Sequence, residues 1–299
     1  MTNFTRALEG VIAFPVTPFD AADRLDESGL RTNVVALLDH PMAAVVAAGG
    51  TGELYSLSED EHRAVVSTTI AAVAGRVPVI AGVGGSLGGA MAMARHAHAE
   101  GVDAILALPP WYPGADRDGL LAYYQSIGGS TPLPLIVYSR DWVNPLPGFV
   151  EDLASSVPTL VAWKDGQGDI RRYQHIMARL GDRLHWIGGA GDDLVGAYYQ
   201  LGIRCYTSSI ANVAPALSLR LHEVAAREDA PALRDLLAAH VTPLYAFRGR
   251  RKGYEVSAMK ALMTLQGRAA GPVRAPLVEV SPGELEELRQ ILQGWAPFL

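Results

Sequence analysis

The 299-residue sequence predicts an α/β protein, a (β/α)8 barrel (TIM barrel) that carries a C-terminal helical extension. Eight short apolar runs recur at intervals of roughly 20 to 35 residues, which is the pitch of a strand–helix unit. Helix-like segments fill the gaps between them, and only helical patterns follow residue 212. Continuous apolar strands that alternate with helices are typical of a parallel sheet covered on its outer face. The count of eight favours a closed barrel over an open, doubly wound sheet.

Each expected strand is an apolar run that ends in glycine, proline or polar residues. The runs are VIAFPVTPF (11–19), AAVVAAGG (43–50), VPVIAGVG (77–84), AILALPP (104–110), PLIVYSR (134–140), LVAWKDG (160–166), LHWIGG (184–189) and CYTSSIAN (205–212). The last of them contains Cys205, which its neighbours mark as a small core residue. Because it is the only cysteine, no disulfide can form within the chain, which fits a reducing compartment.

The helices between the runs carry recognisable start and stop signals. Ser58 and Glu61 form a capping box at the start of one helix. Gly101 is a plausible end for an Ala- and Met-rich helix over residues 88–100. Asp169 is expected to cap a helix that stops at Gly181.

Beyond residue 212 the pattern predicts helices over 215–227, 231–248, 253–266 and 281–293. The first closes the barrel, so we expect the barrel to span residues 1–228 and the extension to span 229–299. The last helix is expected to begin with Ser281 as its N-cap, because proline and then glutamate follow at suitable positions. The basic run RGRRK (248–252) is interpreted as a solvated face or a partner in local ion pairs.

Composition excludes several classes of function. Hydrophobic residues make up 49% and charged residues 19%, which indicates a folded chain with a large core. A net charge of −6 argues against a nucleic-acid partner. The first ten residues, MTNFTRALEG, show no secretory signal, and no apolar stretch approaches the roughly 20 residues of a membrane span. No His/Cys cluster has metal-ligand spacing. We therefore expect a cytoplasmic protein without a metal, a membrane partner or nucleic acid.

The chemistry of such a barrel is expected where its strands end, because the active site of a (β/α)8 barrel lies at the C-terminal ends of the strands. Several polar side chains follow the predicted strands. They are Gly50 and Thr51 after the second strand, Tyr138 and Arg140 at the fifth, Lys164 at the sixth and Ser208 at the eighth. A glycine-rich turn, a phenol, two cations and a hydroxyl would then face one mouth.

Lys164 is the most informative of these residues. It directly follows the apolar residues LVAW (160–163), and a lysine buried at a strand end answers with a lowered pKa, which makes it a nucleophile. The alternative is an ammonium group that extends past the strand into solvent. From the ten residues LVAWKDGQGD (160–169) alone, the two interpretations stay open.

The other candidates also have ordinary explanations. Gly50 and Thr51 could belong to a plain strand-to-helix turn, or their N–H groups could bind a carboxylate. Tyr138 could be a core tyrosine and Arg140 a surface ion pair. Convergence at one end of one barrel favours a shared site. GVGGSL (82–87) lacks the last glycine of a dinucleotide fingerprint, so no such cofactor is expected.

Taken together, GGTGE (49–53), Tyr138 and Lys164 make the chain resemble the dihydrodipicolinate synthase / N-acetylneuraminate lyase family of Schiff-base barrels over nearly its whole length. The resemblance implies catalytic parts for Lys164, Tyr138 and Thr51, with Lys164 forming the Schiff base. Tyr112 matches the tyrosine that family dimers exchange between active sites, which implies a homo-oligomer, a dimer or a tetramer. Two departures stand out. Gly50-Thr51 replaces the usual Thr-Thr pair, and Asp165–Asp169 (DGQGD) replaces the Glu-Ala-Thr-Gly of the synthases.

Within the family, KDGQGD, RKGYEVSAMKA and GPVRAPL resemble the 5-dehydro-4-deoxyglucarate dehydratases. That resemblance implies a cofactor-free lyase that converts a six-carbon keto-diacid to 2,5-dioxopentanoate, CO2 and water. It also implies that Gly50 and Thr51 hold the keto-acid carboxylate, and that Arg140 and Ser208 are candidates for the distal end. A 2-keto-3-deoxy sugar-acid aldolase on the same scaffold is the alternative. A catalytically silent sugar-acid-binding barrel is the alternative from a different class. A phosphate-binding isomerase is disfavoured by the two acids in GGAGDD (188–193).

Overall fold

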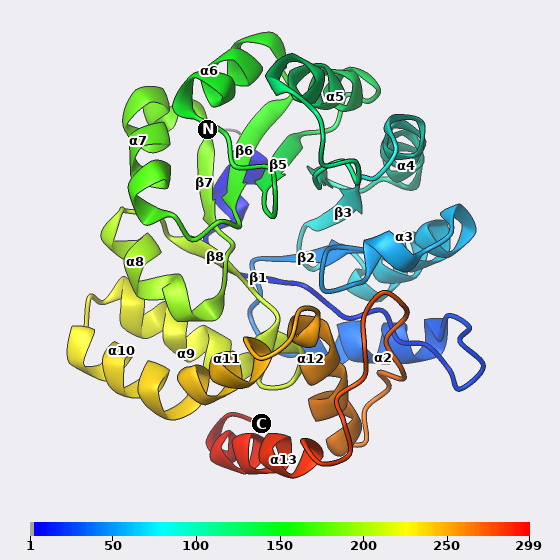
Figure 1. Ribbon diagram of the computed structural model, residues 1–299, viewed down its shortest axis with the longest axis vertical. Helices are drawn as coiled ribbons and strands as arrows, with labels where there is room; N and C mark the ends of the chain where they lie inside the picture. The colour runs from blue at the N-terminus through cyan, green and yellow to red at the C-terminus, as the bar shows by residue number, and fades with distance from the viewer. Residues whose placement is uncertain (1–2) are drawn as a thin grey trace.

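The computed structural model describes residues 3–299 and contains a closed barrel of eight parallel strands (Figure 1). The strands are β1 (Gly10–Ala13), β2 (Ala44–Ala47), β3 (Val79–Val83), β4 (Ala104–Ala107), β5 (Leu135–Ser139), β6 (Leu160–Asp165), β7 (His185–Gly188) and β8 (Cys205–Ser208). They follow chain order around the barrel, and β8 pairs with β1. The predicted fold class is confirmed. Met1 and Thr2, part of the stretch in which the sequence shows no secretory signal, lie outside the described residues.

The strands are shorter than the apolar runs that predict them. The first run extends to Phe19, but β1 ends at Ala13, ahead of two prolines that could not donate to a strand ladder. The eighth run extends to Asn212, but β8 ends at Ser208 and a 3-10 turn, η4 (Ile210–Asn212), follows. The remainder of each run forms the loops at the barrel mouth.

The outer ring consists of helices that alternate with the strands (Figure 1). They are α2 (Glu27–Leu37), α3 (Glu59–Val73), α4 (Leu87–Glu100), α5 (Arg117–Gly129), α6 (Pro147–Ser156), α7 (Ile170–Leu180), α8 (Val195–Gln200) and α9 (Pro215–Ala226), and a short α1 (Asn3–Ala7) precedes β1. The Ser58–Glu61 capping box is present at α3. Asp169 caps α7 by accepting from the N–H of Arg172 at 3.0 Å.

The extension begins with α10 (Ala230–Leu236), a π-helical turn η5 (Leu237–Val241) and α11 (Thr242–Arg248), and continues with α12 (Tyr254–Leu265) and α13 (Leu285–Gly294). The predicted start of the last helix is wrong. Ser281 gives both its N–H and its hydroxyl to the carboxylate of Glu284, at 3.1 and 2.5 Å, so its oxygen does not cap the helix. These bonds close a turn, and α13 starts at Leu285.

A buried ion pair ties the extension to the barrel. Glu53, which follows β2 with a left-handed backbone (φ 57°), lies 2.5 Å from the ammonium of Lys260 on α12. The pair is at most 1% exposed. The Glu53 carboxylate also accepts the backbone N–H of Arg274 at 3.0 Å, and Lys260 donates to the carbonyl of Pro272 at 2.7 Å. The loop after β2 and the C-terminal segment are therefore held as one unit.

Hydropathy along the helices gives a separate result. Within residues 3–299, no helix combines the length and the apolar character that crossing a membrane requires.

Candidate active site

Lys164 lies inside the barrel mouth at the C-terminal end of β6. Lys164 is 2% exposed, so the interpretation of its side chain as one that extends into solvent is wrong. The Nζ atom donates to the carbonyl oxygen of Gly189 at 3.0 Å and lies 3.2 Å from the centre of the Tyr138 ring. Phe14 approaches from another side, with its ring centre 5.1 Å from Nζ. The amine is therefore enclosed by two aromatic rings.

Burial lowers the pKa of Lys164 well below that of an exposed lysine, and the positive charge of Arg140 lowers it further. The carboxylate of Asp165 acts in the opposite direction, but more weakly. That carboxylate has its own partners, since it accepts from the hydroxyl of Tyr198 at 2.7 Å and from the N–H of Gly168 at 3.2 Å. A lysine with a lowered pKa supplies the neutral amine that attacks a carbonyl.

Tyr138 stands beside Lys164, because the two residues are partners in the β5–β6 register. Its hydroxyl donates to the carbonyl of Gly189 at 3.3 Å, the same oxygen that Lys164 contacts. Burial raises the pKa of the phenol, so it keeps its proton at neutral pH. A protonated phenol next to a neutral amine is suited to moving protons at an imine carbon.

Two glycines leave room for this pair. A β-carbon at Gly189 would lie 2.6 Å from Cγ and Cε of Lys164, and one at Gly166 would lie 2.4 Å from the ring of Tyr138. Both separations are far below a normal carbon–carbon contact of about 3.5 Å. The Gly166 contact explains part of the difference from the synthase sequence after Lys164, because a larger residue at position 166 would displace Tyr138.

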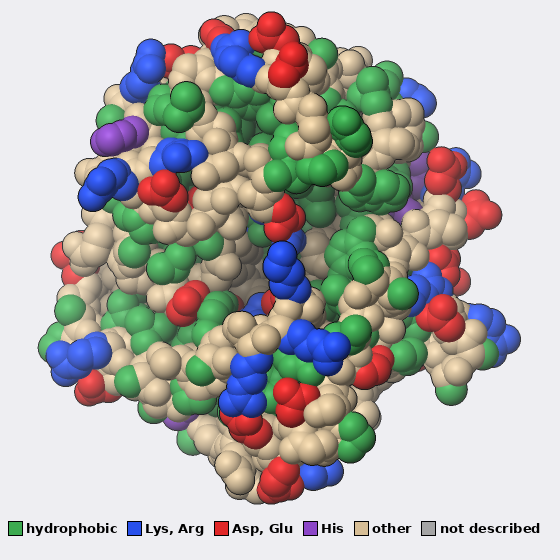
Figure 2. All heavy atoms as spheres, viewed as in Figure 1, with side chains coloured by type: hydrophobic (Ala, Val, Ile, Leu, Met, Phe, Trp, Pro, Cys, Tyr) green, Lys and Arg blue, Asp and Glu red, His purple; other side chains and the backbone are tan. Residues whose placement is uncertain are grey.

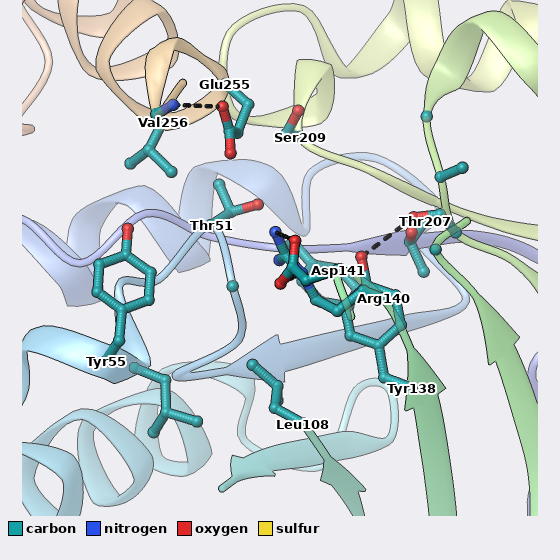
Figure 3. A pocket seen from close by; sticks show the side chains of 18 of the residues that line it. Thr51, Tyr55, Leu108, Tyr138, Arg140, Asp141, Thr207, Ser209, Glu255 and Val256 are labelled. Carbon is teal, nitrogen blue, oxygen red and sulfur yellow. Dashed lines mark hydrogen bonds and ion pairs between the residues drawn. The ribbon is translucent and has the colours of Figure 1, made fainter. Parts of the chain in front are cut away.

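Gly50 makes room in the same way for Arg140. A β-carbon at residue 50 would lie 2.7 Å from Nη1 of Arg140, so the guanidinium passes directly over this glycine. Arg140 also bonds to the carboxylate of Asp141 at 2.8 Å. Figure 3 shows Thr51, Arg140 and Tyr138 around one space, with Ser209 and Glu255 across from them. The replacement of the usual Thr-Thr pair by Gly50-Thr51 thus matches the position of the arginine.

Ser208 is buried at the pocket wall, and its hydroxyl is fully engaged. It donates to Asp192 at 2.5 Å and accepts from the N–H of Ala211 at 3.1 Å, and it lies 2.8 Å from the hydroxyl of Ser218. Asp192 also accepts from Tyr245 at 3.1 Å, and burial raises its pKa to about 6. The sequence predicted Ser208 as a site residue but not Asp192. The acidic motif GGAGDD (188–193) was the signal that could have identified Asp192.

These residues line a pocket of about 780 Å³ at the barrel mouth. Its wall includes part of the extension, namely Tyr245, Arg248, Gly249, Lys252, Gly253, Glu255, Val256, Pro276 and Leu277. Figure 2 shows the hollow on this face, with basic side chains in it and along its edge over α11 and α12. Arg250 pairs with Glu287 at 2.6 Å, as the ion-pair interpretation of RGRRK expects. For Arg248 and Lys252 that interpretation is incomplete, because both face the pocket.

Tyr112 does not join this pocket within its own chain. The residue is 74% exposed on the loop between β4 and α5, whereas its neighbour Trp111 lines the pocket. Among the described residues, no group of three or more histidine, cysteine, aspartate or glutamate side chains is placed to hold a metal ion.

The structure brings Lys164, Tyr138, Thr51 and Arg140 together at one pocket and leaves Tyr112 apart from it.

Comparison with solved structures shows the same architecture. Dihydrodipicolinate synthase from Bacillus clausii superposes with a TM-score of 0.92 at 26% identity, covering 98% of this chain and 99% of that one. The synthase from Oceanobacillus iheyensis gives a TM-score of 0.92 at 27% identity, with 98% of each chain covered.

Two curated relatives have a higher sequence identity to this chain than these solved structures do. A protein of Xanthomonas campestris pv. campestris named "Probable 5-dehydro-4-deoxyglucarate dehydratase" is 40% identical over 288 residues, which are 95% of this chain and 94% of that one. A protein of Azotobacter vinelandii with the same name is 35% identical over 290 residues, 96% of each chain. The model of the dihydrodipicolinate synthetase family matches residues 7–294. With Lys164 enclosed at the end of β6 in a barrel of this kind, the chain belongs to the dihydrodipicolinate synthetase family.

Proposed function

We propose that this protein dehydrates and decarboxylates 5-dehydro-4-deoxyglucarate to 2,5-dioxopentanoate through a Schiff base on Lys164. The observation that carries the proposal is the buried amine of Lys164, with its lowered pKa, against the ring of Tyr138. The names of the relatives support the choice of substrate within the family.

The reaction needs one amine and no further electron sink. The amine of Lys164 adds to the C5 ketone and expels water, which gives an iminium. Loss of a C4 proton gives an enamine, which expels the C3 hydroxyl as water after that oxygen takes a proton. The iminium is then conjugated to C3, so C1 can leave C2 as CO2 while its electron pair flows into the iminium. C2 keeps its hydroxyl and becomes an enol, then the aldehyde. C4 takes back a proton, which restores the iminium, and hydrolysis then consumes one water, returns the lysine and releases the product, so one water is lost overall.

The remaining residues divide the substrate between them. The N–H groups of Gly50 and Thr51, with the Thr51 hydroxyl, hold the C6 carboxylate beside the ketone. Tyr138 carries the proton to the C3 oxygen. Arg140 lies beside the C6 carboxylate and the imine, because its guanidinium passes over Gly50. The hydroxyl of Ser208 already has its hydrogen-bond partners. Ser208 therefore positions the carboxylate of Asp192 and does not bind the substrate itself.

We further propose a cytoplasmic homo-oligomer, a dimer or a tetramer, in which Tyr112 enters a neighbouring subunit's site. The exposed position of Tyr112 near its own pocket is consistent with that role. Sedimentation should detect an oligomer, and mixing Tyr112→Phe with Lys164→Ala subunits should restore activity if the sites are shared. An active monomer would refute the proposal.

The alternative is an aldolase, because the same enamine can break a carbon–carbon bond. The test supplies the keto-diacid and measures CO2, 2,5-dioxopentanoate and pyruvate together, with Lys164→Ala as the control. One CO2 for each substrate consumed, without pyruvate, supports the dehydratase. Pyruvate without CO2 makes the protein an aldolase. A protein that binds the keto-diacid without product, and without a borohydride-stable adduct, would be a sugar-acid-binding barrel.

A further inference from the structure

The pocket contains two cations that the proposed chemistry does not use. Arg248 is the last residue of α11, and Lys252 lies in the short connection to α12. Both belong to the extension, and both line the pocket that contains Lys164. The proposed substrate carries two carboxylates, and Gly50 and Thr51 account for only one of them. The second carboxylate therefore needs a partner.

Arg140 is poorly placed to be that partner. Its guanidinium passes over Gly50, at the end of the pocket assigned to the first carboxylate. It also bonds to Asp141 at 2.8 Å and lies 5.5 Å from the centre of the Tyr138 ring. The guanidinium of Arg140 therefore lies close to the imine. Its positive charge lowers the pKa of Lys164, which agrees with that position.

Arg248 and Lys252 line the pocket from the extension. The guanidinium of Arg248 donates to the hydroxyl of Ser209 at 3.2 Å and lies 4.8 Å from the ring centre of Tyr245. These contacts fix its plane and leave other N–H groups available. Lys252 is exposed, and its ammonium makes no ion pair or hydrogen bond with another described residue. An unpaired cation at a pocket wall attracts an anion.

The acidic groups on the same wall already have partners. Asp192 is bonded to Ser208 and Tyr245, and the carboxylate of Glu255 accepts the N–H of Gly253 at 3.0 Å. Neither of them is paired with Lys252. Among the described residues of the extension that line the pocket, the Lys252 ammonium therefore has no carboxylate partner.

We propose that Arg248 and Lys252 bind the C1 carboxylate of the keto-diacid, so that the extension selects dicarboxylic over monocarboxylic substrates. This inference rests on the proposed function. Both cations keep contact with solvent, which suits the task, because C1 must leave as CO2 and a fully desolvated cation would stabilise the carboxylate against departure. The two residues determine specificity, and the chemical step stays with Lys164 and Tyr138.

The test compares two keto acids that differ only at the far end. 2-Oxoadipate has the six-carbon dicarboxylate skeleton without the hydroxyls, so it can form the imine but cannot eliminate water. 2-Oxohexanoate has the same length and ends in a methyl group. Borohydride fixes either imine on Lys164, and mass spectrometry of the peptide gives the concentration at which half of the protein is modified.

The unmodified protein should favour 2-oxoadipate by about tenfold or more, the effect of one charge-assisted contact. Lys252→Met and Arg248→Met should each reduce that preference, and the double variant should abolish it, with trapping of 2-oxohexanoate unchanged. Arg250→Met is the matched control, because Arg250 lies in the same basic run but pairs with Glu287, and it should keep the full preference.

The possible failures are distinguishable. If the unmodified protein traps both acids at equal concentrations, or if the double variant keeps the preference, the role of Arg248 and Lys252 is refuted while the Schiff base stands. If neither acid gives an adduct on Lys164, the proposed function fails and this inference fails with it.

Discussion

Replacing Lys260 with methionine should destabilise the fold through Glu53. The substitution keeps most of the aliphatic stem and removes the ammonium that lies 2.5 Å from the Glu53 carboxylate. Because the pair is at most 1% exposed, water cannot replace the lost partner. Breaking a buried ion pair from one side costs about 3–5 kcal/mol. At the unfolding entropy typical of globular domains, a chain of this length should then melt roughly 5–8 °C lower.

The loss should depend on pH with a defined sign. Burial raises the pKa of Glu53 even with Lys260 present, and removing the lysine raises it further. The folded variant then holds a proton that the unfolded chain releases, so its free energy of unfolding falls as the pH rises. The deficit relative to the unmodified protein should be full at pH 7 and should shrink toward pH 4.

Equilibrium unfolding in urea at several pH values measures both effects. The double variant Glu53→Gln/Lys260→Met is the control, because it removes both charges and should recover much of the stability. A loss below about 1 kcal/mol for Lys260→Met at pH 7 would refute the reasoning. So would a deficit that does not change with pH.

Three further predictions concern the pocket. Tyr138→Phe should keep the fold and the imine but lower kcat by about 10²- to 10⁴-fold, and turnover within a few-fold of normal would make Tyr138 a packing residue. Gly50→Thr should displace the Arg140 guanidinium, which the new β-carbon would approach to 2.7 Å, and steady-state kinetics should show KM raised by about tenfold. Arg140→Met should raise the pKa of Lys164 by removing a neighbouring positive charge. When the yield of borohydride trapping is plotted against pH, its acid limb should therefore move to higher pH. An unmoved limb would contradict the assigned coupling.

The sequence predicted the barrel well because strands buried on both faces must be apolar along their whole length. This signal identified all eight strands, although prolines and polar residues made the runs longer than the ladders. Lys164 was conspicuous for the same reason, as a charge inside such a run. Its burial could not be read from the run, because it depends on Phe14, Tyr138 and Gly189, which come from three other strands or their loops.

The parts that escaped prediction depend on packing between distant segments. RGRRK has the same composition whether it faces solvent or a pocket. Only the docking of α11 and α12 places Arg248 and Lys252 at the pocket wall, while Arg250 pairs with Glu287 instead. Ser281 had the right neighbours for a cap, but the competing acceptor, Glu284, lay within the same motif. Local patterns do not decide such competitions.

The wall that the extension gives to the pocket has a consequence for the order in which the protein matures on the ribosome. Every strand of the barrel, with Lys164 and Tyr138, is synthesised before Tyr245, Arg248 and Leu277. At usual elongation rates the roughly 70 residues from β8 to Leu277 take about 3–14 s to emerge. Through that interval a nascent barrel would present its amine to water on one side. The nucleophile acquires its finished surroundings last, when the chain's final quarter folds over the mouth.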